Sequence, residues 1–204
     1  MSKRQRIIAV GGISGVGKST LCEYVSNSNP RITYLESGDY KAKIAAEVFG
    51  KKLALLDERE SKEVNGIFIK GLRENFEGEN LLVGLHYGYY ILRGERIQMI
   101  GLLPEDFLGE IDQHVLVYTS EEEIISRRRK TGEKKLLALD SGFVKSQLDH
   151  EASEAAKAAK GSNGELYWFR NDCGLYLSRS IFRRGISDLF EEIGRENISP
   201  HINP

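Results

Sequence analysis

The chain has 204 residues, of which 40% are hydrophobic, and its 29 lysines and arginines balance 30 aspartates and glutamates to a formal net charge of −1. This length can bury the core of one α/β domain, and the near-neutral charge argues against a protein that binds nucleic acid through bulk electrostatics. No apolar run approaches the ~20 residues of a membrane span, so no membrane partner is predicted.

The cysteines and the N-terminus bear on the cellular compartment. Cys22 and Cys173 are far apart in the sequence and lack metal-site spacing, so we expect reduced thiols. The N-terminus is basic, but the apolar stretch after it is too short for a signal peptide. These features predict a cytoplasmic protein.

Short apolar runs alternate with helical patterns, which predicts an α/β fold with a mostly parallel sheet and helices on both faces. The predicted strands are Arg6–Gly11, Arg31–Glu36, Asn80–Leu85, His114–Thr119 and Glu165–Arg170. The predicted longer helices are Glu58–Glu77, Asp140–Lys160 and Gly174–Arg195. The sequence pattern of residues 88–100 predicts a β-hairpin inserted after the third strand. No linker divides the chain, so we expect one domain over residues 1–204.

The segment between the first strand and the first helix reads Gly-Ile-Ser-Gly-Val-Gly-Lys-Ser over residues 12–19. It matches the phosphate-loop pattern G-x-x-x-x-G-K-[ST] in one register, in the strand–loop–helix context that the pattern requires. Glycines let consecutive N–H groups point at an anion, and the helix N-terminus adds positive charge. Lys18 is predicted to reach the β- and γ-phosphates of ATP, and Ser19 to bind Mg²⁺. The predicted nucleotide-binding residues of this loop are Gly12, Ser14, Gly15, Val16, Gly17, Lys18, Ser19 and Thr20.

Ligands of such sheets bind at the carboxyl ends of the strands, so the residues that follow each strand are further candidates. Ser37, Gly38 and Asp39 follow the second strand. Asp39 suits either a Mg²⁺ ligand beside Ser19 or the N-cap of a helix over Lys41–Phe49.

Two other strand ends carry polar candidates. His86 follows the third strand, either as a ligand contact or as a structural histidine. Asn171 and Gly174 follow the fifth strand, and they either contact the nucleotide base or turn the chain into the last helix.

A basic run, Arg127–Lys130, ends the helix after the fourth strand, with Lys134 and Lys135 beyond it. Such a run alone is typical of a solvated helix end, which the helix dipole favours. Beside a phosphate loop, arginines are also the usual groups that neutralise a transferring phosphoryl. We therefore predict that Arg127 and Arg128 are catalytic, within a small lid over about residues 127–140.

Taken in order, these segments resemble the P-loop nucleoside monophosphate kinases, and most of all the archaeal-type adenylate kinases, over about Arg6 to Phe190. The resemblance rests on Gly12–Thr20, Glu36–Asp39, Asp57–Arg59, His86, Glu122–Arg128, Asn171 and Gly174. It implies the P-loop three-layer sandwich with strand order 2-3-1-4-5, and transfer of the γ-phosphate of Mg-ATP to a nucleoside monophosphate, AMP above all. It further implies a homo-oligomer and places Ser37, Gly38, Asp39, Arg59 and His86 on the substrate side.

The sequence departs from this family at two places. Gly84 stands where the family has an aspartate two residues before the histidine, and Lys134-Lys135 followed by Leu136 replaces a lid pair that is usually two arginines before an aspartate.

Two alternative functions remain open. The fold accepts many substrates, so a kinase for another small-molecule acceptor is possible. Gly84 favours a nucleotide-dependent binding or switch protein with weak ATPase activity. The sequence lacks the Asn-Lys-x-Asp and Asp-x-x-Gly motifs of a GTPase switch. It is also too short for an AAA-type motor, and it lacks the acidic pair that such motors carry after the third strand.

Overall fold

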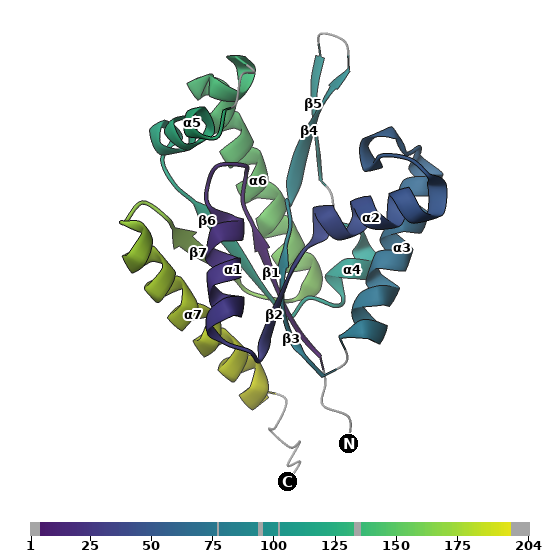
Figure 1. Ribbon diagram of the computed structural model, residues 1–204, viewed down its shortest axis with the longest axis vertical. Coiled ribbons are helices and arrows are strands. Elements are labelled where there is room, and N and C mark those ends of the chain that lie inside the picture. Colours follow the sequence, from purple (N-terminus) through teal and green to yellow (C-terminus); the bar gives the residue numbers. More distant parts are fainter. Residues whose placement is uncertain (1–4, 77, 94–95, 102, 133–135, 197–204) are drawn as a thin grey trace.

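The computed structural model describes residues 5–76, 78–93, 96–101, 103–132 and 136–196. Its main sheet is parallel and has the strand order β2-β3-β1-β6-β7 (Figure 1). The strands are β1 (Arg6–Gly11), β2 (Ile32–Glu36), β3 (Asn80–Gly84), β6 (Gln113–Tyr118) and β7 (Leu166–Arg170). The expected five-stranded fold and the order 2-3-1-4-5 are confirmed, and each predicted strand agrees with the structure to within one residue at either end.

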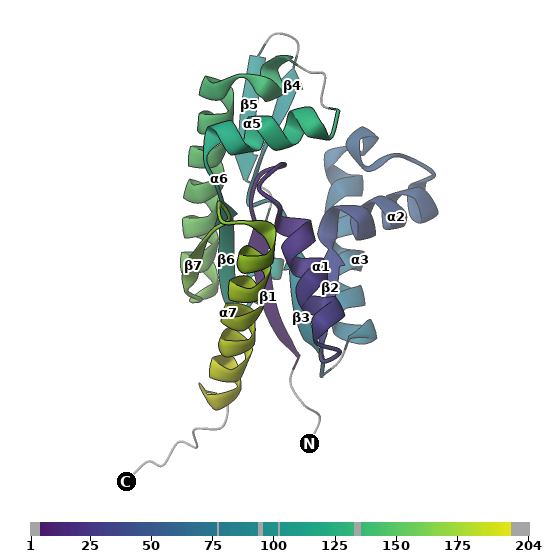
Figure 2. The ribbon, with the colours of Figure 1, turned by 60° about the vertical axis from the view of Figure 1, so that its left-hand side comes forward.

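The central strand shows why these residues form a buried sheet. Ile7 and Ala9 belong to a core shared with the helices of residues 37–49, 58–75, 105–108 and 141–162, whereas Ile8 and Val10 belong to a second core shared chiefly with the helices of residues 18–28 and 175–196. Because alternate residues of a strand point to opposite faces, a fully apolar strand must be covered on both sides. Figures 1 and 2 show the resulting three layers.

The helices agree with the predicted pattern except at the start of α2. Their bounds are α1 (Lys18–Ser28), α2 (Ser37–Phe49), α3 (Glu58–Asn75), α4 (Glu105–Leu108), α5 (Glu121–Lys130), α6 (Ser141–Ser162) and α7 (Leu175–Glu196), with short 3₁₀ turns at Leu53–Leu55 and Leu136–Leu139. Helix α2 begins at Ser37, four residues earlier than predicted, so Asp39 lies in its first turn and is not its N-cap. Ser37 and Gly38 do not break the helix, and an acidic residue in the first turn is favoured by the helix dipole.

Helix α3 begins at the predicted residue because of a capping box. The Asp57 carboxylate accepts from the Glu60 N–H at 2.9 Å, and the Glu60 carboxylate accepts from the Asp57 N–H at 3.0 Å. Asp57, the first acidic residue of the Asp57–Arg59 segment, therefore has a local structural role.

The hairpin predicted over residues 88–100 consists of β4 (Gly88–Arg93) and β5 (Arg96–Gly101), which pair antiparallel. It rises beyond the carboxyl ends of the main sheet, and α6 packs against β4 (Figure 1). Of the predicted lid, Lys134 and Lys135 lie outside the described residues. In the described part of the chain, no helix combines the length and the apolar character that crossing a bilayer would need.

Candidate active site

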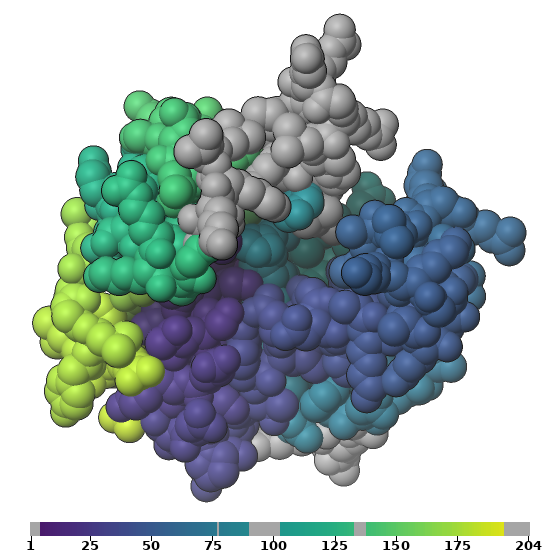
Figure 3. Space-filling view, turned by 45° about the horizontal axis from the view of Figure 1, so that its top comes forward, coloured from purple at the N-terminus to yellow at the C-terminus, as the bar shows by residue number. Residues whose placement is uncertain are grey.

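A cleft of about 660 Å³ opens at the carboxyl ends of β1, β2 and β3. It is lined by Ile13, Ser14, Gly15, Gly17, Lys18, Ser19, Thr20, Glu36, Asp39, His86, Arg127, Lys130 and Thr131. Figure 3 looks onto this end of the molecule, where the α5 segment and the α2–α3 segment stand on either side of the phosphate loop. The cleft thus lies where parallel-sheet proteins bind their ligands.

The loop between β1 and α1 has the curled backbone that the glycines predict. Gly12, Gly15 and Gly17 have φ angles of +144°, +96° and +89°, which side chains other than glycine rarely adopt. A Cβ atom at Gly17 would lie 2.6 Å from the Asn171 Nδ2 atom, and one at Gly12 would lie 2.6 Å from the Val117 carbonyl oxygen. The loop therefore fits a cradle of backbone N–H groups for phosphate oxygens, and α1 begins at its end.

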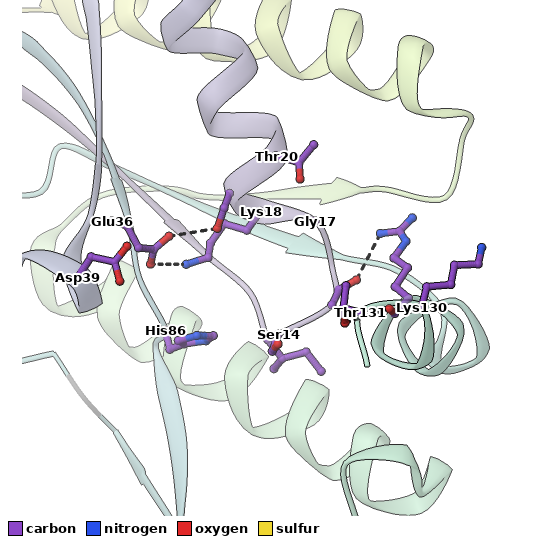
Figure 4. Close-up of a pocket in the computed structure, with 13 residues that line it drawn as sticks. Ser14, Gly17, Lys18, Thr20, Glu36, Asp39, His86, Lys130 and Thr131 are labelled. Atoms are coloured by element: carbon purple, nitrogen blue, oxygen red, sulfur yellow. Dashed lines mark hydrogen bonds and ion pairs between the residues drawn. The ribbon is translucent and has the colours of Figure 1, made fainter. Parts of the chain in front are cut away.

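The Glu36 carboxylate joins the two functional side chains of the loop (Figure 4). Its Oε1 atom is 2.9 Å from the Lys18 ammonium, and its Oε2 atom accepts from the Ser19 hydroxyl at 3.2 Å and from the Tyr34 phenol. Burial alone would raise the pKa of Glu36, but the charge of Lys18 and these hydrogen bonds outweigh it and hold the pKa below its usual range. Glu36 is therefore ionised at neutral pH.

A second carboxylate holds the loop from the side of α6. Glu151 is 1% exposed, and it accepts hydrogen bonds from the backbone N–H groups of Gly12 at 2.8 Å, Tyr87 at 3.0 Å and Gly88 at 2.8 Å. Burial raises the pKa of Glu151, although the three N–H groups and the charge of Lys18 oppose the rise. One side chain thus ties α6 to the phosphate loop and to the start of the hairpin.

His86 and Asp39 line the cleft on the side away from α5, as Figure 4 shows. His86 is half-buried, with its Nδ1 atom 4.0 Å from the Glu151 carboxylate. Burial and the charge of Lys18 lower the pKa of His86 to about 4, so its ring is neutral at pH 7. This side of the cleft therefore presents two carboxylates, from Glu36 and Asp39, and one neutral imidazole.

The two lid arginines point to different places because neighbouring helical residues lie about 100° apart. Arg127 lines the cleft, and its guanidinium donates to the carbonyl oxygens of Val16 and Asn171, both at 2.9 Å, and to the Glu123 carboxylate at 2.7 Å. Arg128 is buried, and it donates to the carbonyl oxygens of Ser14 at 2.9 Å and Ala138 at 2.7 Å, and also to the Gln147 side chain at 3.1 Å. The structure brings Arg127 to the cleft but not Arg128, which supports the loop from behind.

The remaining predicted residues lie around the cleft without lining it. Asn171 is buried and donates from its amide to the Val16 carbonyl at 2.7 Å, so it braces the loop. Ser37 is buried, whereas Gly38 and Arg59 are exposed. Gly174 immediately precedes α7. Arg59 lies in the first turn of α3 and does not line the cleft with Asp39 and His86.

Sequence reasoning did not name Ile13, Glu36 or Glu151 as residues of this site, and it included Lys130 and Thr131 only as part of the predicted lid. A signal existed for Glu151, which stands three residues after Leu148 and four before Ala155, so a charged residue falls in the apolar stripe of α6. A charge at a core-facing position of a helix indicates a special role. Glu36 carried a weaker signal, since it is the last residue of a predicted strand.

The donor set fits Mg²⁺ bound together with a nucleotide. In the described portion of the structure, no group of three or more His, Cys, Asp or Glu side chains could hold a metal on its own. Mg²⁺ needs no such group, because it takes one or two protein oxygens and fills its other positions with water and phosphate oxygens. The Ser19 hydroxyl beside a carboxylate meets that requirement: Ser19 donates to Glu36, and the predicted ligand Asp39 lines the same cleft.

The phosphate loop at the end of a central parallel strand, covered by helices on both faces, defines a P-loop protein with a kinase fold. The family model described as "AAA domain" matches residues 11–140, so the chain belongs to this family, and its fold is that of P-loop kinases. The chain is also 30% identical over 145 residues to a probable thymidylate kinase of Archaeoglobus fulgidus, which corresponds to 62% of this chain and 70% of that protein.

Solved structures show the same fold at low sequence identity. Shikimate kinase from Bacteroides thetaiotaomicron has a TM-score of 0.55 and 17% identity, covering 91% of this chain and 98% of that one. A gluconokinase from Sinorhizobium meliloti has a TM-score of 0.54 and 17% identity, covering 95% and 98%. The tunicamycin resistance protein of Deinococcus radiodurans has a TM-score of 0.57 and 13% identity, covering 92% and 96%.

Proposed function

We propose that the protein transfers the γ-phosphoryl group of Mg-ATP to a small acceptor that binds beside Asp39 and His86. The observation that carries this proposal is the juxtaposition, in one cleft, of the phosphate-loop Lys18 and the α5 residue Arg127 with the carboxylates of Glu36 and Asp39. The cations suit the donor phosphates, and the side of the cleft away from α5 is left for the acceptor.

The chain's own residues have separable roles in such a transfer. The loop N–H groups orient the phosphates, and Lys18 places a charge beside the β- and γ-oxygens, where negative charge develops. Arg127 donates from the opposite rim, after exchanging its carbonyl partners for phosphate oxygens. Bound Mg²⁺, held through Ser19, would neutralise phosphate charge. Asn171 and Gly174 remain our candidates beside the donor base.

The first acceptor candidate is a nucleoside monophosphate, with AMP as the specific prediction. The relationship to a probable thymidylate kinase supports this class of acceptor. The residues proposed for it are Ser37–Asp39, Arg59 and His86. Of these, Arg59 lies outside the cleft and would have to approach by movement of α3 toward α5.

The second acceptor candidate is a small molecule with a hydroxyl group, and the charge on the acceptor side favours it. Among the described residues, the cations that line the cleft are Lys18, Arg127 and Lys130, which belong to the loop and α5. Asp39 would repel an anionic acceptor at close range, but it would suit a neutral hydroxyl by accepting its proton.

A single panel of assays separates these functions. ADP formation from Mg-ATP is measured with AMP, CMP, UMP, GMP and dTMP, and with a set of small polyols, using Lys18→Ala as the inactive control. Turnover with a monophosphate supports the first candidate, and turnover with a polyol alone supports the second. ATP binding without turnover on any acceptor would refute the kinase proposal and favour a nucleotide-dependent binding protein.

A further inference from the structure

The end of β3 has no side chain to offer to the cleft, because Gly84 stands there. In the β2–β3 register Gly84 lies directly opposite Glu36. A Cβ atom built at Gly84 would lie 2.8 Å from the Glu36 Oε2 atom and 2.7 Å from the Tyr34 hydroxyl. The space that a residue-84 side chain would fill is therefore taken by the carboxylate from the neighbouring strand.

The carboxylate in that space is fixed on both oxygens. Oε1 contacts the Lys18 ammonium, whose side chain is 7% exposed, and Oε2 accepts from the Ser19 hydroxyl and from Tyr34. The Tyr34 phenol donates to Oε2 from the same strand and holds this oxygen in place. P-loop NTPases generally bind Mg²⁺ between the loop Ser/Thr and a carboxylate from the sheet, and here that carboxylate comes from β2.

We infer that Glu36 is the carboxylate that positions Mg²⁺ beside Ser19 when nucleotide binds, taking the place that the glycine at the end of β3 leaves vacant. This inference rests on the proposed use of Mg-ATP. In the absence of nucleotide, the same carboxylate keeps Lys18 and Ser19 in their functional positions. With nucleotide bound, the Lys18 ammonium would pair with the phosphates, and the Glu36 carboxylate would then be available to hold the metal beside Ser19.

A purely structural role for Glu36 makes a different prediction. If Glu36 were only the counter-ion of Lys18, its neutralisation would change ATP affinity equally with and without metal. A metal-positioning carboxylate instead affects the coupling, which is the ratio of ATP affinities in the presence and absence of Mg²⁺. Glu36→Gln keeps the shape of the side chain and removes the charge.

The experiment measures ATP binding by calorimetry in Mg²⁺ and in EDTA for the wild type, Glu36→Gln, Asp39→Asn and the surface control Glu47→Gln. We expect Glu36→Gln to lower the Mg²⁺ coupling at least tenfold, with metal-free ATP affinity unchanged or higher because Lys18 is released. Glu47→Gln should keep the wild-type coupling. Unchanged coupling in Glu36→Gln, or its loss only in Asp39→Asn, would overturn the inference.

Moving the carboxylate by mutation from position 36 to position 84 gives an independent readout. Mn²⁺ binding to the complex with ADP is followed by electron paramagnetic resonance for Glu36→Ala and for Glu36→Ala combined with Gly84→Asp, with thermal melting as the check on folding. We expect Mn²⁺ affinity to be lost in the first variant and partly restored in the second. If Glu36→Ala binds Mn²⁺ as the wild type does, the inference is wrong.

The two proposals can fail separately. Normal Mg²⁺ coupling in Glu36→Gln together with phosphoryl transfer by the wild type would leave the proposed function standing and remove the inference. Loss of coupling in Glu36→Gln, in a protein that transfers phosphate to none of the acceptors, would keep the inference and remove the proposed function.

Discussion

Replacing Glu151 should loosen the phosphate loop and destabilise the folded protein. Its carboxylate accepts three buried backbone hydrogen bonds, one from the phosphate loop and two from the start of the hairpin. In Glu151→Gln the retained carbonyl oxygen still accepts from Gly12 and Tyr87, but an amide NH₂ group faces the N–H of Gly88. In Glu151→Ala all three N–H groups lose their acceptor at a position that is 1% exposed.

The expected losses follow from the number of acceptors removed. A hydrogen bond to a charged group contributes ~1.5–3 kcal/mol, so Glu151→Gln should lower the free energy of unfolding by about 2 kcal/mol. Three unsatisfied donors cost ~1–3 kcal/mol each, and relief of the buried charge offsets part of this, which gives about 4 kcal/mol for Glu151→Ala. At ~2–4 °C per kcal/mol for a chain of this size, Tm should fall by about 6 °C and about 12 °C.

Urea unfolding followed by circular dichroism at pH 7 measures these losses, and calorimetry measures the accompanying fall in ATP affinity. Asp149→Ala is the matched control, since Asp149 is exposed on the same helix two residues earlier. Its free energy of unfolding should change by no more than ~0.5 kcal/mol. A loss below about 1 kcal/mol in Glu151→Ala would refute the reasoning. So small a loss would mean that water or a backbone movement satisfies the three N–H groups when the carboxylate is absent.

Lys18→Ala should lower kcat by about 10²-fold or more with a folded circular dichroism spectrum, because the γ-phosphoryl loses its stabilising charge; normal turnover would contradict the kinase proposal. Arg127→Ala should lower kcat far more than ATP affinity, whereas Lys134→Ala should give a mild, salt-sensitive effect. Steady-state kinetics at two ionic strengths checks this, and the reverse order would refute the placement of the catalytic cation. Burial lowers the pKa of His114 to about 4 in the folded protein, from the ordinary value of 6.5. As the pH falls, the His114 ring is therefore protonated in the unfolded chain before it is protonated in the folded one. This group's contribution to stability is full above pH 6.5 and is lost toward pH 4. The free energy of unfolding should therefore decrease by about 1.3 kcal/mol from pH 7.5 to 5.5 on its account. Urea unfolding of His114→Gln at both pH values should show a pH-dependent decrease that is smaller by this amount than in the wild type. The same pH dependence in both proteins would contradict a neutral buried ring.

The sheet and the phosphate loop could be predicted because their signals are local. Apolar runs such as that of β1 and the glycine spacing of residues 12–19 are complete within one short segment. The start of α2 was missed because the Ser37-Gly38 pair reads as a turn in isolation, yet it continues directly from β2 into the helix. Local sequence describes an element well but describes the passage between elements less well.

The candidate site was predictable only in part, because its further contacts depend on tertiary register. The importance of Glu36 follows from its position opposite Gly84, which pattern alone does not reveal. Asp39 was the carboxylate chosen from sequence, since it follows the second strand, whereas Glu36 is that strand's last residue. Similarly, the spacing of Arg127 and Arg128 predicts that they diverge, but only the packing of α5 shows which of them faces the cleft.

The face-to-face pairing of Glu36 and Gly84 has a consequence for how this family diverges. The paired ends of β2 and β3 leave space for only one side chain between positions 36 and 84. An acidic side chain at one of these positions therefore requires a small residue at the other. Relatives should therefore vary at these two sites in concert, with an acid at the first beside glycine at the second, or the reverse. A change at either position alone passes through a clash or through loss of the carboxylate, so we expect intermediates to be rare. The pair would then sort relatives into two lineages by the strand that delivers the acid.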